Sequence, residues 1–446
     1  MDKRLPVGAG QREVLLLAFY FPPSTIAGTF RTLQFARYLP EFGWRPRVIT
    51  VAHRTGERLD PQLSAEVPPG TAVLRLPCFD PLSAWRRIKR TRAARVGRAS
   101  QAAEESSGRP GSVKRFIGDA LHFPDDDVGW IPFALLPALW HARRRSVAAI
   151  WSTGPPWATH LLALLLKRLS GKPWVADFRD PWARNPARTW SVPAFQRLSE
   201  RLERKVARSA DVLVGVTQPL ADSLRRNLPP GKPDPVVLPN GWDAAQFDGL
   251  ERKPPHTFTL TYAGALYNVR NPEHLLAGIG KFVHANGASR RNIRVLFVGS
   301  AFEEHEALVR RLGLEGVVQS IRHMPHREVL RTIASSHVLV DLLTNDQSRA
   351  YCIPCKLYEY LAARRPILML AGRGPASEMV ARSGVGTVAP PDDADAIAQA
   401  IERLHAEHKV WRDVQPDEAL LSEHEARHLT ARLAGLLDSL VGGSRR

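Results

Sequence analysis

Charged side chains follow an apolar segment in the stretch from Lys172 to Pro186, KPWVADFRDPWARNP, where packing alone would not place them. The apolar residues predict a strand at Pro173–Asp177, and Asp177, Arg179 and Asp180 come at its end. Ligands of parallel-sheet proteins bind at such strand ends, and a carboxylate there can bind or deprotonate a hydroxyl group. We therefore take Asp180 as the candidate catalytic carboxylate.

A second charged segment runs from Tyr351 to Leu370, YCIPCKLYEYLAARRPILML, and places Lys356 and Glu359 on a short helix before an apolar strand. Lys356 stands at the predicted helix start, where backbone N–H groups and the helix dipole add to its charge in binding phosphate. Glu359, three residues later, lies on about the same helix face. A surface lysine and an exposed glutamate are the plain alternatives. Two charged segments so far apart in sequence suggest two half-sites that face one cleft.

The length of the chain favours two domains, and its three cysteines fit a reducing compartment. A chain of 446 residues exceeds what one hydrophobic core usually supports, which predicts two domains of roughly 200 residues each.

No apolar run approaches the ~18–20 residues of a membrane-spanning helix, and we interpret the apolar run near the N-terminus as the first strand of a cytoplasmic protein. Cys352 and Cys355 form a single C-x-x-C, without the second pair that structural zinc needs. We expect no metal and no cofactor.

Positive charge is concentrated in two places. The formal net charge is +18, the segment Trp85–Arg98 carries seven Lys/Arg and no acid, and Arg143–Arg145 adds three more. Such runs attract anionic lipid, nucleic acid or phosphorylated substrates. A solvated helix face is the plain alternative, and the chain has no recognisable helix-turn-helix, finger or RNA-recognition motif. We predict contact with an anionic membrane surface and no nucleic-acid partner.

Strand-length apolar runs alternate with helix-length amphipathic segments through most of the chain, the pattern of β-α units on a parallel sheet. The predicted fold class is therefore α/β. Helices are expected between most strands, among them Trp157–Leu169 and Pro193–Arg208. The expected strands of the first half are Glu13–Phe19, Arg45–Val51, Thr71–Leu76, Val147–Ser152, Pro173–Asp177, Ala210–Gly215 and Pro235–Leu238. Those of the second half are Phe258–Ala263, Ile293–Val298, Val317–Ile321, Val338–Leu342, Pro366–Leu370 and Gly386–Ala389.

The polar segment Pro239–His256 contains Asn-Gly, Gly and Pro-Pro, which are typical of turns and loops and end helices and strands. It predicts a first Rossmann-like domain at 1–240, a linker at 241–256 and a second Rossmann-like domain at 257–417. Residues 418–446 are expected to form one amphipathic helix, Glu418–Leu440, and a tail. The span from Ser83 to Asp127 is the irregular part of the first domain.

Six sequence motifs occur in a fixed order over about residues 13 to 405. They are FYFPPSTIAGTFRTLQFARYLPEFGWRPRVIT, WSTGPPWATH, KPWVADFRDPW, LPNGWD, YAGALYNVRNPEHLL and PCKLYEYLAARRPIL. Together they resemble a retaining GT-B-fold glycosyltransferase of group 1, a family 4-like enzyme.

The resemblance implies a GT-B architecture of two Rossmann-like domains and transfer of a sugar from a nucleotide-sugar donor to an acceptor hydroxyl. In this family the second domain holds the nucleotide and the first holds the acceptor, and the configuration of the sugar is retained. The front-face attack proposed for relatives needs no protein nucleophile. A UDP-linked hexose is the default donor.

Donor residues follow from that implied reaction. Negative charge develops on the diphosphate as the glycosidic bond breaks, so cations there lower the barrier. Lys356 and Arg270 are the candidates; Arg270 matches one member of an Arg/Lys pair in relatives, and Ala265 occupies the other place. Glu359 matches a glutamate that accepts hydrogen bonds from the donor ribose. Tyr351 stands where many relatives have a further Glu that contacts the donor sugar, which leaves the sugar open.

Other positions are carried over as ligand contacts. Glycines at strand and helix ends let a ligand approach the backbone closely. The further donor-binding candidates are Gly28, Arg31, Gly264 and Gly299. The acceptor-side candidates are Thr153, Gly154, Asp177, Arg179 and Trp182. For Arg179, an internal Asp–Arg pair that shapes the loop is the favoured alternative.

The basic segment Trp85–Arg98 and the apolar, Trp-containing segment Phe123–Trp140 both belong to the first domain, where the acceptor is expected. A lipid-linked oligosaccharide of a surface polysaccharide, reached by docking at the inner membrane face, explains both. Two alternatives stay open. One is a catalytically silent GT-B-like protein that binds a glycan or acts as a scaffold, and the other is an enzyme that glycosylates a soluble small molecule.

Overall fold

The computed structural model describes residues 12–53, 57, 59–79, 112–185, 188, 190–266, 270–285, 292–299, 302–344, 351 and 353–443. The basic segment Trp85–Arg98 lies outside these residues. The chain divides into two compact units. Unit 1 comprises residues 1–58, 67–237 and 433–446, and unit 2 comprises residues 59–66 and 238–432. In the described part of the chain, every helix is too short or too polar to cross a bilayer.

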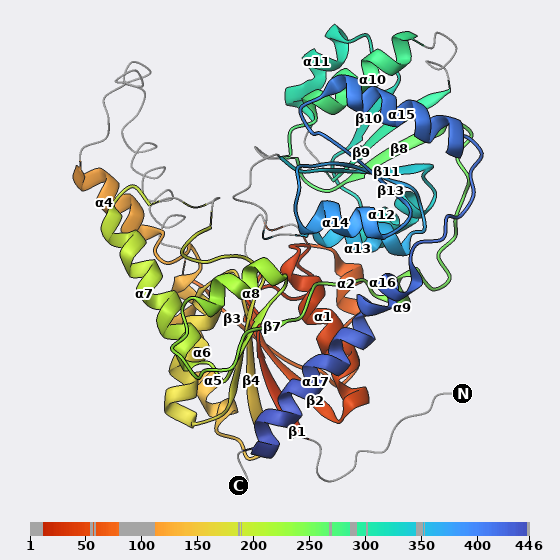
Figure 1. Ribbon diagram of the computed structural model, residues 1–446. Coiled ribbons are helices and arrows are strands. Elements are labelled where there is room, and N and C mark those ends of the chain that lie inside the picture. The colour runs from red at the N-terminus through yellow and green to blue at the C-terminus, as the bar shows by residue number, and fades with distance from the viewer. Residues whose placement is uncertain are drawn as a thin grey trace, which may run out of the picture. The chain divides into compact units, whose positions relative to one another are not determined.

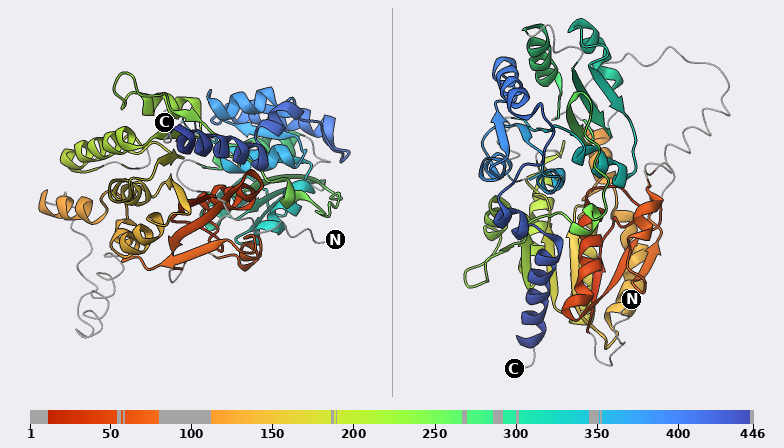
Figure 2. Two further views of the ribbon diagram at one scale, coloured as in Figure 1. Left: turned by 90° about the horizontal axis from the view of Figure 1, so that it is seen from below. Right: turned by 90° about the vertical axis from the view of Figure 1, so that its right-hand side faces the viewer.

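Unit 1 is built on a parallel sheet of seven strands in the order β3-β2-β1-β4-β5-β6-β7. Its strands are β1 (Arg12–Leu17), β2 (Trp44–Val51), β3 (Ala72–Leu76), β4 (Val147–Gly154), β5 (Trp174–Phe178), β6 (Val212–Gly215) and β7 (Val236–Val237). Central strands read as continuous apolar runs because helices cover both faces of the sheet (Figure 2). All seven predicted strands are present, with ends within two residues of the prediction.

The strand order of unit 1 reverses between β1 and β4. The helix α1 (Gly28–Tyr38) follows β1, and α6 (Ala158–Ser170) follows β4. Such a switch point opens a crevice at the carboxyl ends of the strands, where ligands of this kind of sheet bind. In this crevice region Thr153 of β4 is paired in register with Asp177 of β5.

The other helices of unit 1 are α4 (Ser112–Leu121), α5 (Ile131–Ala142), α7 (Pro193–Ser209) and α8 (Gln218–Arg225). The helix α4 lies in the span that the sequence analysis treated as irregular. The end of the chain also packs here: Leu433 and Leu437 of α17 (Ala426–Gly443) are fully buried, and Trp44 Nε1 donates a hydrogen bond to Asp438 at 3.1 Å.

Unit 2 is built on a six-stranded parallel sheet in the order β10-β9-β8-β11-β12-β13. Its strands are β8 (Phe258–Ala263), β9 (Ile293–Val298), β10 (Val318–Ile321), β11 (Val338–Leu342), β12 (Ile367–Leu370) and β13 (Gly386–Ala389), again within two residues of the prediction. Helices cover both faces of this sheet (Figure 1), each across one apolar cluster. One face packs against α10 (Glu273–Ala285), α11 (Glu306–Arg311) and α15 (Ala394–His408). The other packs against α12 (His326–Ala334), α13 (Cys355–Ala362) and α14 (Pro375–Arg382).

A short segment between β2 and β3 groups with unit 2, although the sequence analysis placed it in the first domain. It contains α2 (Pro61–Ala65), whose N-terminal N–H group at Gln62 donates to Asp60 at 2.9 Å. The same Asp60 carboxylate accepts the backbone N–H of His326 at 2.9 Å, so it caps α12 as well. Unit 2 also contains α9 (Ala244–Phe247), and Gln246 of this helix hydrogen-bonds to Glu66 at 3.0 Å.

The predicted single helix Glu418–Leu440 is wrong, because the structure has α16 (Glu418–Glu423) and then α17. The backbone of Trp242 interrupts it: Trp242 N–H donates to His424 O at 3.1 Å, and Ala426 N–H donates to Trp242 O at 2.8 Å. Glu425 then caps α17 by accepting backbone N–H groups of the first turn. Two helices replace one because the backbone groups at the break have partners outside the helix.

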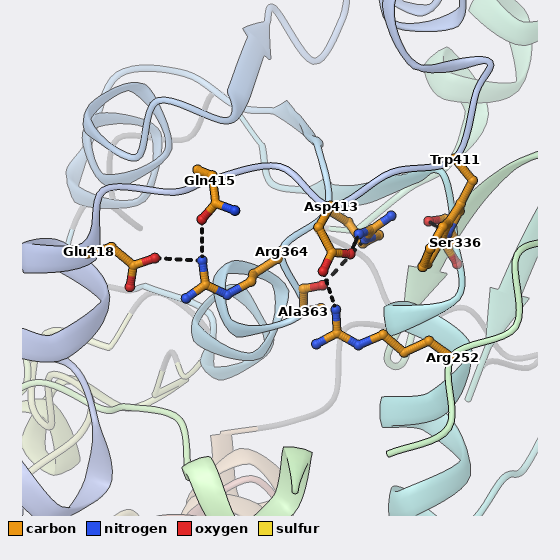
Figure 3. A network of polar contacts seen from close by, with 9 residues as sticks. Arg252, Ser336, Ala363, Arg364, Trp411, Asp413, Gln415 and Glu418 are labelled. Atoms are coloured by element: carbon orange, nitrogen blue, oxygen red, sulfur yellow. Dashed lines mark hydrogen bonds and ion pairs between the residues drawn. The ribbon is translucent and has the colours of Figure 1, made fainter. Parts of the chain in front are cut away.

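Two consecutive arginines after α13 hold the 411–418 segment against unit 2 (Figure 3). Arg365 is fully buried, forms an ion pair with Asp413 and stacks 4.2 Å from the Trp411 ring centroid. Arg364 has a left-handed backbone, φ 54°, and its guanidinium pairs with Glu418 at 2.6 Å. These contacts fix the turn from α13 into β12, and thus the position of α13.

Candidate functional site

The predicted donor residues of unit 2 come together where the strand order reverses between β8 and β11. Gly264 follows β8 and Gly299 follows β9, with φ angles of 134° and 86° that favour glycine. A Cβ atom at Gly264 would lie 3.8 Å from Nζ of Lys356, and one at Gly299 would lie 3.7 Å from the Gly264 backbone. The structure thus places Gly264, Gly299 and Lys356 together at the switch point of the sheet, where ligands of such sheets bind.

Lys356, in the first turn of α13, is largely buried and lies beside a buried carboxylate. Its Nζ lies 2.8 Å from Oδ1 of Asp341 and 3.6 Å from the ring centroid of Tyr262. Burial lowers the pKa of Lys356 to about 7, Asp341 opposes this shift, and the charge of Arg270 adds to it. The ammonium group therefore changes charge near neutral pH, at a position suited to an anionic ligand.

The effect of Arg270 on Lys356 places both predicted cations in one electrostatic environment. Gly264 and Gly299 carry no side chain beside these cations, which lets a ligand approach the backbone closely. Two positive groups and close backbone approach are the features that bind a diphosphate and stabilise it as it leaves.

Glu359 faces an unexpected partner. Its Oε1 lies 3.0 Å from Nε2 of His326, and both side chains are largely buried. Burial lowers the pKa of His326, but the carboxylates of Glu359, Glu66 and Asp60 outweigh burial and raise it above its ordinary value. The other oxygen of Glu359 can accept hydrogen bonds from hydroxyl groups.

In unit 1 two predicted ligand residues bind each other. Arg31 donates from Nε to Asp177 Oδ2 at 2.7 Å and from Nη2 to Oδ1 at 2.9 Å, with both side chains buried. Arg31 and Asp177 thus form an internal Asp–Arg pair at this loop, with Arg31 as the cation. The assignment of Arg31 to the donor and of Asp177 to the acceptor stays a prediction.

Gly28, Gly154 and Arg179 lie together at the ends of β4 and β5. A Cβ atom at Gly28 would lie 1.9 Å from Nη1 of Arg179, so only glycine leaves that space to the guanidinium. The Arg179 backbone N–H donates to Gly154 O at 2.9 Å, and Nη2 donates to Pro155 O. Asp180, the candidate catalytic carboxylate, follows directly and is half-buried.

Two further acceptor-side candidates, Trp182 and Thr153, are buried. Trp182 is 4% exposed and stacks on Trp157, with ring centroids 5.2 Å apart and planes 5° apart, so its ring is part of the core. Thr153 is also buried, and its carbonyl accepts the hydroxyl of Thr159 at 2.6 Å.

Sequence reasoning missed three residues of the unit 2 site. The sequence contains a signal for Asp341, because a single carboxylate inside the apolar run VLVDL is buried and therefore needs a polar or charged partner. His326 and Asp60 carried none, since their hydrogen bond joins residues 266 positions apart.

Comparison with known protein families agrees with this geometry. Residues 28–241 match the model described as "Glycosyl transferase 4-like domain", and residues 257–407 match "Glycosyl transferases group 1". The two matches cover most of the chain and correspond to its two sheets. Among curated proteins, none matches the chain significantly.

Solved structures share the fold over nearly the whole chain at low identity. The sucrose-phosphate synthase of Thermosynechococcus elongatus is 15% identical, with 97% of each chain covered and a TM-score of 0.57. Anabaena HepE in complex with UDP-glucose is 13% identical, with 97% of this chain and 99% of that chain covered and a TM-score of 0.57. A UDP-forming α,α-trehalose-phosphate synthase from Burkholderia xenovorans, bound to glucose-6-phosphate, is 14% identical, with coverage of 96% and 100% and a TM-score of 0.58. The two domain matches, with this fold, identify the chain as a GT-B glycosyltransferase.

Proposed function

We propose that this glycosyltransferase transfers a hexose from a UDP-sugar to an acceptor hydroxyl with retention of configuration. The observation that carries the proposal is the buried ammonium of Lys356, held at the switch point of unit 2 beside Gly264 and within the electrostatic reach of Arg270. Solved relatives support the donor class, since one was crystallised with UDP-glucose and another is named UDP-forming.

In this proposal Lys356 and Arg270 bind the diphosphate and stabilise the negative charge that grows on it as the glycosidic bond breaks. Glu359, positioned by its contact with His326, accepts hydrogen bonds from the ribose hydroxyls. Gly264 and Gly299 give the nucleotide access to the backbone. The acceptor hydroxyl attacks from the face that the diphosphate leaves, and the leaving phosphate takes up its proton.

The acceptor we propose is a lipid-linked oligosaccharide of a surface polysaccharide, reached at the inner face of the cell membrane. The carboxyl ends of β4 and β5 supply Asp180 and Arg179 for it, with Asp180 as the residue that accepts a hydrogen bond from the hydroxyl and orients it, while the proton passes to the leaving phosphate. Support comes from the strongly positive chain and from the apolar helix α5 described below.

Transfer is tested with UDP-sugars that differ in the sugar and with two acceptor pools, a membrane lipid extract and soluble oligosaccharides. NMR of the product gives the configuration of the new linkage. We expect a lipid-linked product with the donor's anomeric configuration, made by wild type and by Lys281→Ala but not by Lys356→Ala. Lys281 is the control because it also pairs with an aspartate, Asp395, but at the surface. An inverted linkage contradicts retention, and a product only on soluble acceptors contradicts the lipid-linked acceptor.

A further inference from the structure

The helix α5 (Ile131–Ala142) differs from an ordinary surface helix, because it buries small residues and exposes large apolar ones. Its buried face consists of small residues, Ala134, Ala138 and Ala142, all with 0% exposure. Three of its large apolar residues face outward, with Phe133 43%, Leu136 73% and Trp140 64% exposed. A globular helix normally buries its large apolar residues and exposes polar ones.

The three outward residues form one row, which we call the α5 ridge. Phe133, Leu136 and Trp140 follow the spacing i, i+3 and i+7, which places them on a single helix face. Single exposed apolar side chains are common, but a contiguous row on one element marks an interaction surface.

Arginines continue directly from the C-terminal end of the ridge. Arg143, Arg144 and Arg145 are all exposed, and the guanidinium of Arg144 lies 5.2 Å from the ring centroid of Trp140. Arg143 donates to the carbonyl of Leu169 at 3.2 Å, and Leu169 is itself an exposed apolar residue. Cations therefore border the apolar row without an exposed acid between them.

We infer that the α5 ridge inserts into the surface of a lipid bilayer that carries anionic headgroups. A single row of three side chains offers a few hundred Å², well below the roughly 800 Å² per partner of a stable protein interface. A tryptophan beside arginines matches the interfacial region, where the indole lies at headgroup level and the cations meet anionic lipid. The inference deepens the proposed function and rests on it for the lipid-linked acceptor, while the ridge belongs to unit 1 and the donor site to unit 2.

Co-flotation of the full-length protein with vesicles tests the inference. Wild type is expected to float with phosphatidylcholine vesicles that contain phosphatidylglycerol and to float weakly with pure phosphatidylcholine. Leu136→Asp and Trp140→Asp should each weaken binding at least tenfold, because a charge replaces an inserted apolar group. Val410→Asp is the matched control, since Val410 is 69% exposed in unit 2, and it should bind as wild type does. Replacing Arg143, Arg144 and Arg145 together by Gln should weaken binding to the anionic vesicles by roughly a hundredfold.

Two results overturn the inference. One is flotation of Leu136→Asp and Trp140→Asp equal to that of Val410→Asp. The other is a wild-type dimer in light scattering that Leu136→Asp dissociates while flotation is unchanged, which makes the ridge a contact between copies. Calorimetry of UDP-sugar binding separates this from the donor proposal: ridge variants should bind donor normally, and Lys356→Ala should lose donor but still float.

Discussion

Oδ1 of Asp341 lies 2.8 Å from Nζ of Lys356, with side chains 0% and 11% exposed. Taking both charges out of water is costly, and burial lowers the pKa of Lys356 to about 7 despite the nearby carboxylate. A bound diphosphate would favour the charged ammonium, so donor binding and protonation of Lys356 are linked.

The first prediction is a pH dependence of donor affinity. Below pH 7 Lys356 is already charged in the unliganded protein, whereas above pH 7 binding must first protonate it. The affinity for UDP-glucose, whose phosphates do not titrate in this range, should be flat below about pH 7 and fall by up to tenfold per pH unit above it. Calorimetry at pH 8 in buffers of different ionisation enthalpy should show proton uptake. Constant affinity from pH 6 to 8.5 would contradict the link.

Asp341→Asn tests whether this carboxylate positions and charges the lysine. Removal of the negative charge lowers the pKa of Lys356 further, so the fall in affinity should begin at lower pH and be partly recovered in acid. Asp395→Asn, which breaks the exposed pair with Lys281, is the control and should leave the profile unchanged. A loss of affinity that is equal at every pH would indicate a structural role alone.

His326→Gln should reduce stability in a pH-dependent way. The folded pKa of His326 is raised, so the ion pair with Glu359 contributes fully below the ordinary pKa of 6.5 and is lost as pH rises through the raised value. Chemical denaturation should show wild type more stable than the variant by about 1–2 kcal/mol at pH 6, with a smaller difference at pH 9. His323→Gln, an exposed site in the same segment, is the control. A difference that grows with pH would refute the assigned charge state.

The Arg31–Asp177 fork should be structural. Arg31→Ala or Asp177→Ala leaves an uncompensated buried charge and should cost about 3–5 kcal/mol of unfolding free energy, measured with urea. The double variant Arg31→Met, Asp177→Leu should recover much of that loss. An Arg31→Ala variant that is stable but binds donor poorly would contradict a structural role and support the prediction that Arg31 contacts the donor.

Sequence predicted the strands well because buried parallel strands are continuous apolar runs, as in Ile367–Leu370. It also brought together Gly264, Gly299 and Lys356, since strand ends of one sheet meet at one edge. It did not predict which charged groups pair with each other, and so assigned Arg31 and Asp177 separate ligands. The break between α16 and α17 and the outward turn of the α5 ridge depend on packing partners far away in sequence.

Binding of UDP-sugars and bare UDP to wild type, Lys356→Ala and Lys281→Ala, measured by calorimetry at pH 6.5, tests the central claim most directly. We predict selective binding of one UDP-sugar by wild type and by Lys281→Ala, and at least a tenfold weaker affinity in Lys356→Ala because a diphosphate contact is removed. Equal binding by all three proteins would contradict the donor site at Lys356, and binding of no nucleotide sugar would contradict a UDP-sugar-dependent transferase.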